Sequence, residues 1–209
     1  YVSGPLFFGT QEKLINQLEA LGGNPQVILS MRGVPTADDI SLSELERLYN
    51  TLREKGTQIS FTGVQTAVSE MMERAGFRER IGEEHFYTSA LATAAFLKKQ
   101  APGCTAFVIG APGLLNALYD VGVTMNDVDP DYVIVGETAS YNYEVITKAV
   151  RLVLNGARLI ATNSDLTGPT EFGIAPACRS LVAPIELATG RKAYFMGKPN
   201  PLMMRTGLH

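Results

Sequence analysis

The chain has 209 residues, of which 45% are hydrophobic and 19% are charged. This length can bury one sizeable core or two smaller ones. The formal net charge is −3 and there is no run of lysine or arginine, which argues against a nucleic-acid-binding protein.

The amino-terminal residues and the cysteines bear on the expected compartment. No apolar stretch reaches the roughly 18 residues of a membrane span. The sequence begins YVSGPLFFGT, which lacks the basic and apolar regions of a signal peptide. Cys104 and Cys178 lie far apart and outside any metal-ligand spacing, as expected of two inert thiols in a reducing compartment. His85 and His209 are too few for a histidine-rich metal site. We therefore expect a cytoplasmic protein without a membrane span or a metal.

Taken in chain order, short apolar runs alternate with amphipathic segments, which is typical of an α/β protein. The apolar runs predict strands at residues 2–8, 26–31, 58–62, 105–109, 131–136, 158–163 and 193–197. Helical spacing predicts helices over 10–21, 41–55, 66–75, 89–97, 114–119, 143–154 and 177–189, with a Gly- and Pro-rich loop over 164–176.

The first series of elements closes at Gly76 and a second series begins near Phe86, which places a junction between about residues 78 and 89. We expect two α/β lobes that meet there. The strands at 2–8, 26–31 and 58–62 would form one sheet, and those at 105–109, 132–135 and 158–161 another. A single sheet through all of them would contradict this division.

The amino-terminal lobe carries the segments GPLFFG and QVILSMRGVPTADDISLSELERL. In the second segment, Val34, Pro35, Asp38 and Leu45 match a pattern of strand, Val-Pro, Asp and helix. This part, residues 1–84, resembles the STAS domain of SulP-type anion (sulfate) transporters and of anti-sigma-factor antagonists. The resemblance implies a protein partner for this lobe and a regulatory loop that includes Asp38 and Ser41.

Ser41 has two interpretations. It is followed three residues later by Glu44, which fits a helix N-cap in a capping box. In the STAS pattern a hydroxyl residue and then a glycine occupy this place, whereas here they are Ile40 and Ser41. Ser41 would then be a phosphorylation switch, but this departure weakens that interpretation.

The remainder of the chain, residues 85–209, carries FYTSALATAAFL, DPDYVIVGETASYNYEVITKA, NGARLIATNSD, PAC, ATGRK and GKPNP in this order. It resembles the cap domain of NagD-like phosphatases of the HAD superfamily, with the start of the returning core. The resemblance implies contact with a phosphorylated small molecule through Thr162, Asn163 and Asp165, at the end of a strand. Arg179 stands where the family usually has glycine after PAC, and we expect it to alter the substrate pocket.

HAD hydrolysis uses a nucleophilic aspartate, a second aspartate two residues later, and further carboxylates that hold Mg²⁺. The counterparts of the two aspartates here are Ser30 and Arg32. Thr62 matches the phosphate-binding position of the second motif and Lys198 the lysine of the third, while the acidic fourth motif would lie beyond the last residue. On this pattern no residue is expected to be catalytic, and no cofactor is expected.

Three hypotheses follow, and the first is preferred. It is a non-catalytic regulatory or interaction module, a natural or engineered chimera of a STAS-like domain and a HAD cap, without Mg²⁺-dependent phosphatase activity. The alternative is an Mg²⁺-dependent NagD-like phosphatase acting on nucleotide monophosphates or sugar phosphates. The third is a small-molecule binding protein that uses Asn163 and Asp165.

Overall fold

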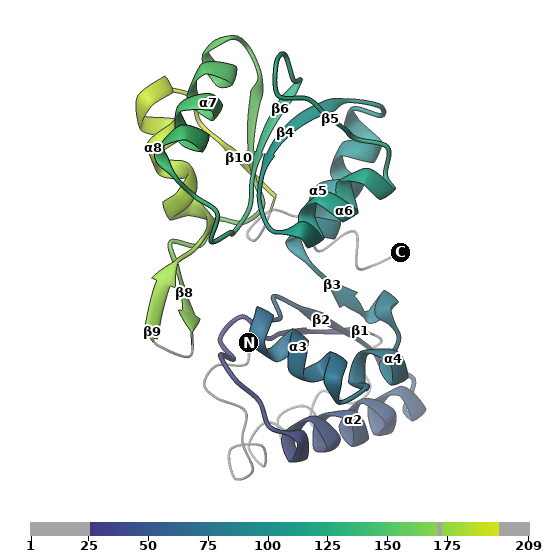
Figure 1. Cartoon of the computed structure of the whole chain (residues 1–209). Coiled ribbons are helices and arrows are strands. Elements are labelled where there is room, and N and C mark those ends of the chain that lie inside the picture. Colours follow the sequence, from purple (N-terminus) through teal and green to yellow (C-terminus); the bar gives the residue numbers. More distant parts are fainter. Residues whose placement is uncertain (1–25, 171–172, 197–209) are drawn as a thin grey trace. The chain divides into compact units, whose positions relative to one another are not determined.

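A computed structural model describes residues 26–170 and 173–196 of the chain (Figure 1). The strand expected at 2–8, the helix expected after Thr10, and Lys198 lie outside these ranges. The chain divides into two compact units. Unit 1 comprises Tyr1–Thr88 with Pro169–Ile174, and unit 2 comprises Ser89–Gly168 with Ala175–His209.

Unit 1 is built on a parallel three-stranded sheet with the order β1-β2-β3. The first two strands confirm the predicted positions, whereas the third strand and the short helix before it carried no clear sequence signal. The described elements are β1 (Gln26–Ser30), α2 (Asp39–Glu54), β2 (Gln58–Thr62), α3 (Thr66–Arg74), α4 (Phe77–Ile81), the 3-10 helix η1 (Glu83–His85) and β3 (Phe86–Tyr87).

The core of unit 1 follows from the alternation of its strands. Leu29 and Phe61 belong to the set of strand side chains that packs in one buried cluster with the apolar stripe of α2. Phe61 is stacked on Phe86 with ring centroids 5.1 Å apart and meets Phe77 edge-on at 5.8 Å. These ring contacts join the sheet to α4 and explain why the weakly periodic segment before β3 is ordered.

The N-cap of α2 differs from the sequence expectation. Asp38, in extended conformation, caps the helix, and its Oδ1 accepts a hydrogen bond of 2.7 Å from the Ser41 backbone N–H. Ser41 lies in the first turn with 1% of its surface exposed, and its hydroxyl has no hydrogen-bond partner among the described residues. Glu44 pairs with Arg47 instead of closing a capping box. The capping interpretation of Ser41 is therefore wrong, because Asp38 begins the helix three residues earlier.

Unit 2 contains a separate parallel sheet with the order β10-β7-β6-β4-β5, and the two sheets are not continuous. The predicted strands at 105–109, 132–135 and 158–161 are confirmed, and β5 was not predicted. The elements are α5 (Ser89–Gln100), β4 (Thr105–Ile109), α6 (Pro112–Asp120), β5 (Thr124–Met125), β6 (Tyr132–Val135), α7 (Tyr143–Leu154), β7 (Arg158–Ala161), β8 (Thr167–Thr170), β9 (Gly173–Pro176), α8 (Cys178–Thr189) and β10 (Tyr194–Phe195).

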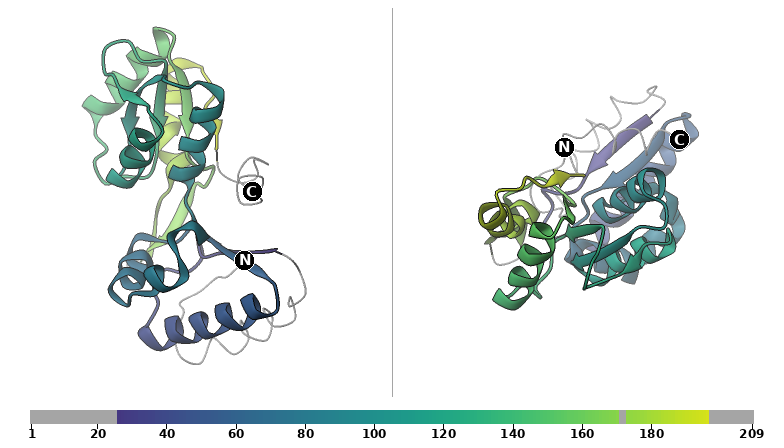
Figure 2. Two further views of the ribbon diagram at one scale, coloured as in Figure 1. Left: turned by 90° about the vertical axis from the view of Figure 1, so that its right-hand side faces the viewer. Right: turned by 90° about the horizontal axis from the view of Figure 1, so that it is seen from above.

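Helices cover both faces of the sheet in unit 2, with α5 and α6 on one side and α7 and α8 on the other (Figures 1 and 2). Along β6, Ile134 points into the cluster with α5 and α6, whereas Val133 and Val135 point into the cluster with α7 and α8. All three side chains are completely buried. This is why the strand reads as a continuous apolar run, as is usual in parallel sheets.

The segment expected to be a loop at 164–176 contains β8 and β9, which pair with each other as a two-stranded sheet. Its glycines and prolines and its mostly exposed side chains give no apolar alternation, so the pattern did not predict strands. Among the described residues, no helix is long and apolar enough to cross a membrane.

Candidate functional site

The carboxyl edge of the unit 1 sheet brings together the counterparts of the first two HAD motifs. Ser30 and Thr62 are the last residues of β1 and β2 and are register partners, and Thr62 is also paired with Tyr87 of β3. The Met31 N–H donates to the Thr62 carbonyl at 2.8 Å, which extends the pairing by one residue. The structure therefore places Ser30 and Thr62 side by side, as parallel strands require.

The turn after β2 lies close to Arg32. Gly63 has a φ of +66°, and a Cβ on it would lie 3.1 Å from the Arg32 Cβ. The Gln65 side-chain amide donates to the Arg32 carbonyl at 2.8 Å. These contacts fix the backbone of both turns against each other.

The residues at this edge do not fit a magnesium ion. Mg²⁺ prefers carboxylate and other oxygen ligands, whereas the strand ends carry two hydroxyls and a guanidinium. Within residues 26–170 and 173–196, no group of three His, Cys, Asp or Glu side chains could hold a metal. His85 is also engaged in the fold, with its Nδ1 3.0 Å from the Ile59 carbonyl oxygen.

The carboxyl edge of the unit 2 sheet is a hydrogen-bonded cluster. The Asn163 amide donates to Oε1 of Glu137 at 2.8 Å, and its Oδ1 accepts from the Asp165 N–H at 3.1 Å. Asn163 follows β7 and Glu137 follows β6, so the cluster joins the ends of two neighbouring strands. Of the three residues predicted to bind substrate, Asn163 and Asp165 are thus linked directly.

The side chains of this cluster differ in how far they are exposed to solvent. Thr162 and Asn163 are 3% and 4% exposed, Asp165 is half-buried and Glu137 is exposed. A ligand can therefore reach the Glu137 carboxylate, while the buried Asn163 side chain holds that carboxylate and the Asp165 backbone in place. Sequence reasoning missed Glu137, although its position directly after a buried strand and Gly136 was a usable signal.

Cys178 lies beneath this edge. Its thiol donates to the Val135 carbonyl at 3.1 Å and accepts from the Thr162 hydroxyl at 3.6 Å. Burial raises the pKa of the Cys178 thiol, and burial also raises that of Cys104. Both cysteines are free and buried, consistent with inert thiols.

Arg179, at the start of α8, packs on a ring. The Arg179 guanidinium carbon lies 4.9 Å from the centroid of Phe195, and the Arg179 backbone N–H donates to the Asp165 carbonyl at 3.0 Å. The backbone contact ties α8 to the loop that carries Asp165.

Two comparisons with known proteins bear on the chain. Residues 1–92 match the family model of the STAS domain. The chain is also 40% identical over 190 residues to the ribonucleotide monophosphatase NagD of Escherichia coli K12, covering 88% of this chain and 73% of that protein. The chain belongs to the NagD-like family of HAD phosphatases.

Further relatives agree with this assignment. The chain is 50% identical over 129 residues to dihydroxyacetone phosphatase of Corynebacterium glutamicum strain R, which covers 62% of this chain. It spans about half of that relative, 47% of its length. The solved structure of NagD from E. coli K-12 has a TM-score of 0.73 and 38% identity, covering 88% of this chain and 73% of that one.

These findings correct three sequence-based expectations. The preferred hypothesis of a non-catalytic module is wrong, because relatives at 40–50% identity are phosphatases. The expectation that the chain is not an enzyme is contradicted for the same reason. The expectation of no cofactor is contradicted too, since NagD-like HAD phosphatases depend on Mg²⁺. Ser30 and Arg32 replace the two aspartates of the first motif, but the similarity to phosphatases extends along most of the chain.

Proposed function

We propose that the chain acts as a phosphatase on phosphate esters of small hydroxylated molecules, and that Glu137 and Asp165 contact the hydroxyl groups of the substrate. The observation that carries the proposal is the hydrogen-bonded chain at the strand ends, in which the buried Asn163 side chain donates to the exposed Glu137 carboxylate and accepts from the Asp165 backbone N–H. The named activities of the relatives supply the reaction class.

The chemistry of the carboxylates favours one end of the substrate. Glu137 and Asp165 repel a phosphoryl dianion but accept hydrogen bonds from hydroxyl groups. Sugars, nucleosides and dihydroxyacetone all carry such hydroxyls. The Asn163 side-chain N–H donates to Glu137, and its carbonyl oxygen accepts from the Asp165 N–H. We therefore assign Asn163 the role of positioning Glu137 and the Asp165 backbone.

The second HAD motif supplies a candidate contact for a phosphoryl group. Thr62, at the end of β2, has the residue type and position of a phosphate-contacting hydroxyl, with Ser30 beside it. The Lys198 ammonium, the counterpart of the third-motif lysine, would neutralise part of the negative charge of the phosphoryl group. Members of the family require Mg²⁺, and the described residues supply no ligand set for that ion.

An assay with matched substrates tests the proposal. Phosphate release would be measured with Mg²⁺ on nucleoside monophosphates, dihydroxyacetone phosphate and an aryl phosphate that lacks hydroxyls. Glu137→Gln and Asp165→Asn should each raise KM for the hydroxylated substrates by about 10-fold, since charge-assisted hydrogen bonds are lost. KM for the aryl phosphate should not change.

The control is Lys98→Gln, on the exposed end of α5, which should behave as wild type. EDTA should abolish release in every variant. Release that never exceeds the EDTA background would overturn the proposed activity. If Glu137→Gln raised KM equally for the hydroxylated substrates and for the aryl phosphate, the assignment of the carboxylates to the substrate hydroxyls would be wrong.

We also propose the domain roles that the sequence suggests. Residues 1–84 would be a STAS-like domain with a HAD-core-like β-α-β-α order, able to take a protein partner, and residues 85–209 would be a NagD-like cap with the start of the returning core. The buried free thiols Cys104 and Cys178 support a cytoplasmic location, where disulfides are rare. The buried Ser41 does not support a phosphorylation switch in the regulatory loop, because a kinase would need the hydroxyl exposed.

A further inference from the structure

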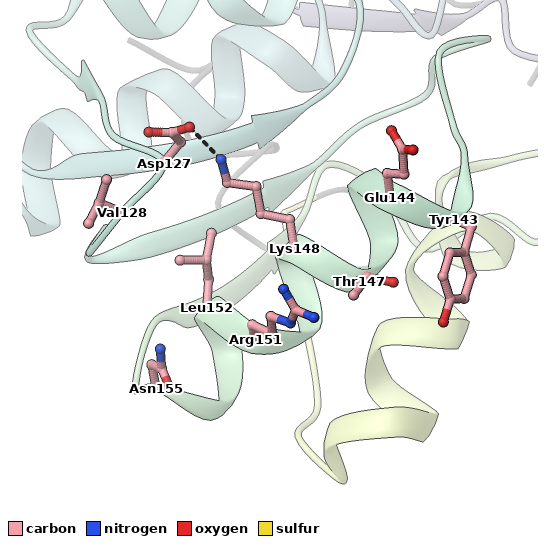
Figure 3. A pocket seen from close by; sticks show the side chains of 9 residues that line it. All are labelled: Asp127, Val128, Tyr143, Glu144, Thr147, Lys148, Arg151, Leu152 and Asn155. Carbon is pink, nitrogen blue, oxygen red and sulfur yellow. Dashed lines mark hydrogen bonds and ion pairs between the residues drawn. The ribbon is translucent and has the colours of Figure 1, made fainter.

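A groove of about 560 Å³ runs along the outer face of α7 in unit 2 (Figure 3). Its floor is the helix face that carries Thr147, Lys148 and Arg151, and Asp127 and Val128 form the facing wall. The volume lies in the range of small-molecule sites. None of its lining residues belongs to the Glu137–Asn163–Asp165 cluster.

The wall of the groove is held by its own hydrogen bonds. Oδ1 of Asn126 accepts from the Val128 N–H at 2.9 Å and from the Asp129 N–H at 3.2 Å. Its amide donates to the Asp129 carbonyl at 3.1 Å. This turn fixes Asp127 and Val128 before a ligand arrives, which lowers the entropic cost of binding.

One cation in the groove is paired and another is not. Lys148 forms a hydrogen-bonded ion pair with Asp127, and this bond lowers the pKa of the Asp127 carboxyl (Figure 3). Both side chains are well exposed, so the pair is weak and open to competition. The Arg151 guanidinium makes no hydrogen bond or ion pair with any described residue. Glu144, the other acid of the groove, points away from Arg151 in Figure 3.

The remaining lining adds a hydroxyl and an apolar surface. Thr147 lies one helical turn before Arg151, on the same face of α7. Val128 is 79% exposed, whereas Leu152, across from it in Figure 3, is only 5% exposed. An oxyanion next to Arg151 would thus have an apolar wall beside it.

From this arrangement we infer that the α7 groove is a second ligand site, which binds the phosphoryl group of a small organic phosphate through Arg151, Thr147 and Lys148. The guanidinium presents two parallel N–H groups to such an oxyanion. Lys148 leaves Asp127 to join it, and the organic part packs on the exposed Val128 side chain. The site is independent of the substrate-binding carboxylates and goes beyond the proposed activity.

The test is an NMR titration of the whole chain with phenylphosphonate, which a phosphatase cannot hydrolyse, and in parallel with inorganic phosphate. EDTA and constant ionic strength suppress metal-dependent binding and bulk salt effects. Saturable shifts are expected at amides 127–128 and 147–155. Phenylphosphonate should bind more tightly than inorganic phosphate, because it alone reaches the apolar wall.

Three variants sharpen the result. Arg151→Gln should weaken phenylphosphonate binding by about 10-fold, as a charge-assisted contact is lost. Asp127→Asn should tighten it by about 2- to 5-fold, because the competing carboxylate of an exposed ion pair is removed. Lys98→Gln removes one exposed cation far along the chain and should have no effect.

Two results would overturn the site. The first is the absence of a saturable shift at the groove amides. The second is an equal weakening of phenylphosphonate binding by Arg151→Gln and Lys98→Gln, because that result indicates charge attraction without a specific site. Weaker binding by Asp127→Asn would overturn the exchange of Lys148 between carboxylate and ligand. Loss of phosphatase activity in the Glu137 or Asp165 variants bears on the other site only.

Discussion

The carboxyl edges of the two sheets are supported in different ways. In unit 2, Glu137, Asn163 and Asp165 form a hydrogen-bonded chain across two strand ends. In unit 1, Ser30 and Thr62 are paired through the backbone register, and the neighbouring Ser60 hydroxyl is buried without a partner among the described residues. The unit 2 edge is thus joined through the Asn163 side chain, and the unit 1 edge mainly through backbone pairing, with one side-chain bond from Gln65 to the Arg32 carbonyl.

The cores beneath the edges also differ. The sheet of unit 2 is apolar on both faces and sits between two helix layers. The described core of unit 1 is a single cluster, and the alternate residues of its strands include Ser30, Ser60 and Thr62, all buried. The two units therefore bury their strands differently: the sheet of unit 2 is apolar on both faces, whereas the strands of unit 1 also bury hydroxyl side chains.

The largest expected effect concerns the separate cores. Phe61→Ala should destabilise unit 1 by about 3–5 kcal/mol, because it leaves a cavity among stacked rings. Native-state hydrogen exchange should show lower protection of the β1 and β2 amides, with β6 amides unchanged. Ile134→Ala, in the core of unit 2, is the matched control and should give the reverse pattern. An equal loss of protection in both sheets would contradict independent cores.

The edges themselves should respond unequally. Asn163→Ala should cost about 1–3 kcal/mol, because it removes two hydrogen bonds and leaves the cluster unsatisfied. Ser60→Ala should be neutral or slightly stabilising, since its buried hydroxyl has no partner among the described residues. Urea unfolding of both variants measures the difference. A larger cost for Ser60→Ala would refute the contrast between the edges.

A smaller effect tests the start of α2. Asp38→Ala should cost about 1 kcal/mol, the usual value for loss of an N-cap. Ser41→Ala should change stability by less than about 0.5 kcal/mol, because its hydroxyl makes no bond to the described residues. Thermal and urea unfolding would measure the loss of stability in the two variants. A larger loss for Ser41→Ala than for Asp38→Ala would assign the N-cap to Ser41.

The smallest effect is a pH dependence in unit 2. The Thr105 N–H and hydroxyl bond to Asp131 at 2.8 and 2.9 Å and lower the pKa of its carboxyl. A lowered pKa means that the stabilisation is present above the unfolded value of about 3.9 and is lost as the pH falls through the folded value. Asp131→Asn should therefore lose a little stability at about pH 6 and almost none at about pH 2. An equal difference at both pH values would contradict the role of the carboxylate.

Several features were predictable from the sequence because they depend on local pattern. β2, β4, β6 and β7 begin or end within two residues of the predicted bounds, since buried parallel strands read as short apolar runs. The positions of Asn163 and Asp165 after β7 followed from the same rule. Substrate-binding roles for these residues stay a prediction.

Other features required distant partners. Glu137 has no local signal of its own beyond its place in the chain, and its role as a fixed acceptor depends on Asn163, 26 residues later. β3 has two residues, too few for any period, and is ordered by pairing with β2 and by the rings of Phe61 and Phe77. The family also could not be judged from Ser30 and Arg32 alone.

The sequence by itself determined the α/β class, the order of the main strands and helices, and the resemblance to both STAS and NagD-like proteins, because periodicity and motif spacing are properties of neighbouring residues. Only the tertiary structure decided that Asp38 and not Ser41 caps α2, that β8 and β9 pair, and that Glu137 joins the edge cluster. Each of these depends on which of several competent groups comes within hydrogen-bonding distance, and that distance is set by the packing of the whole unit.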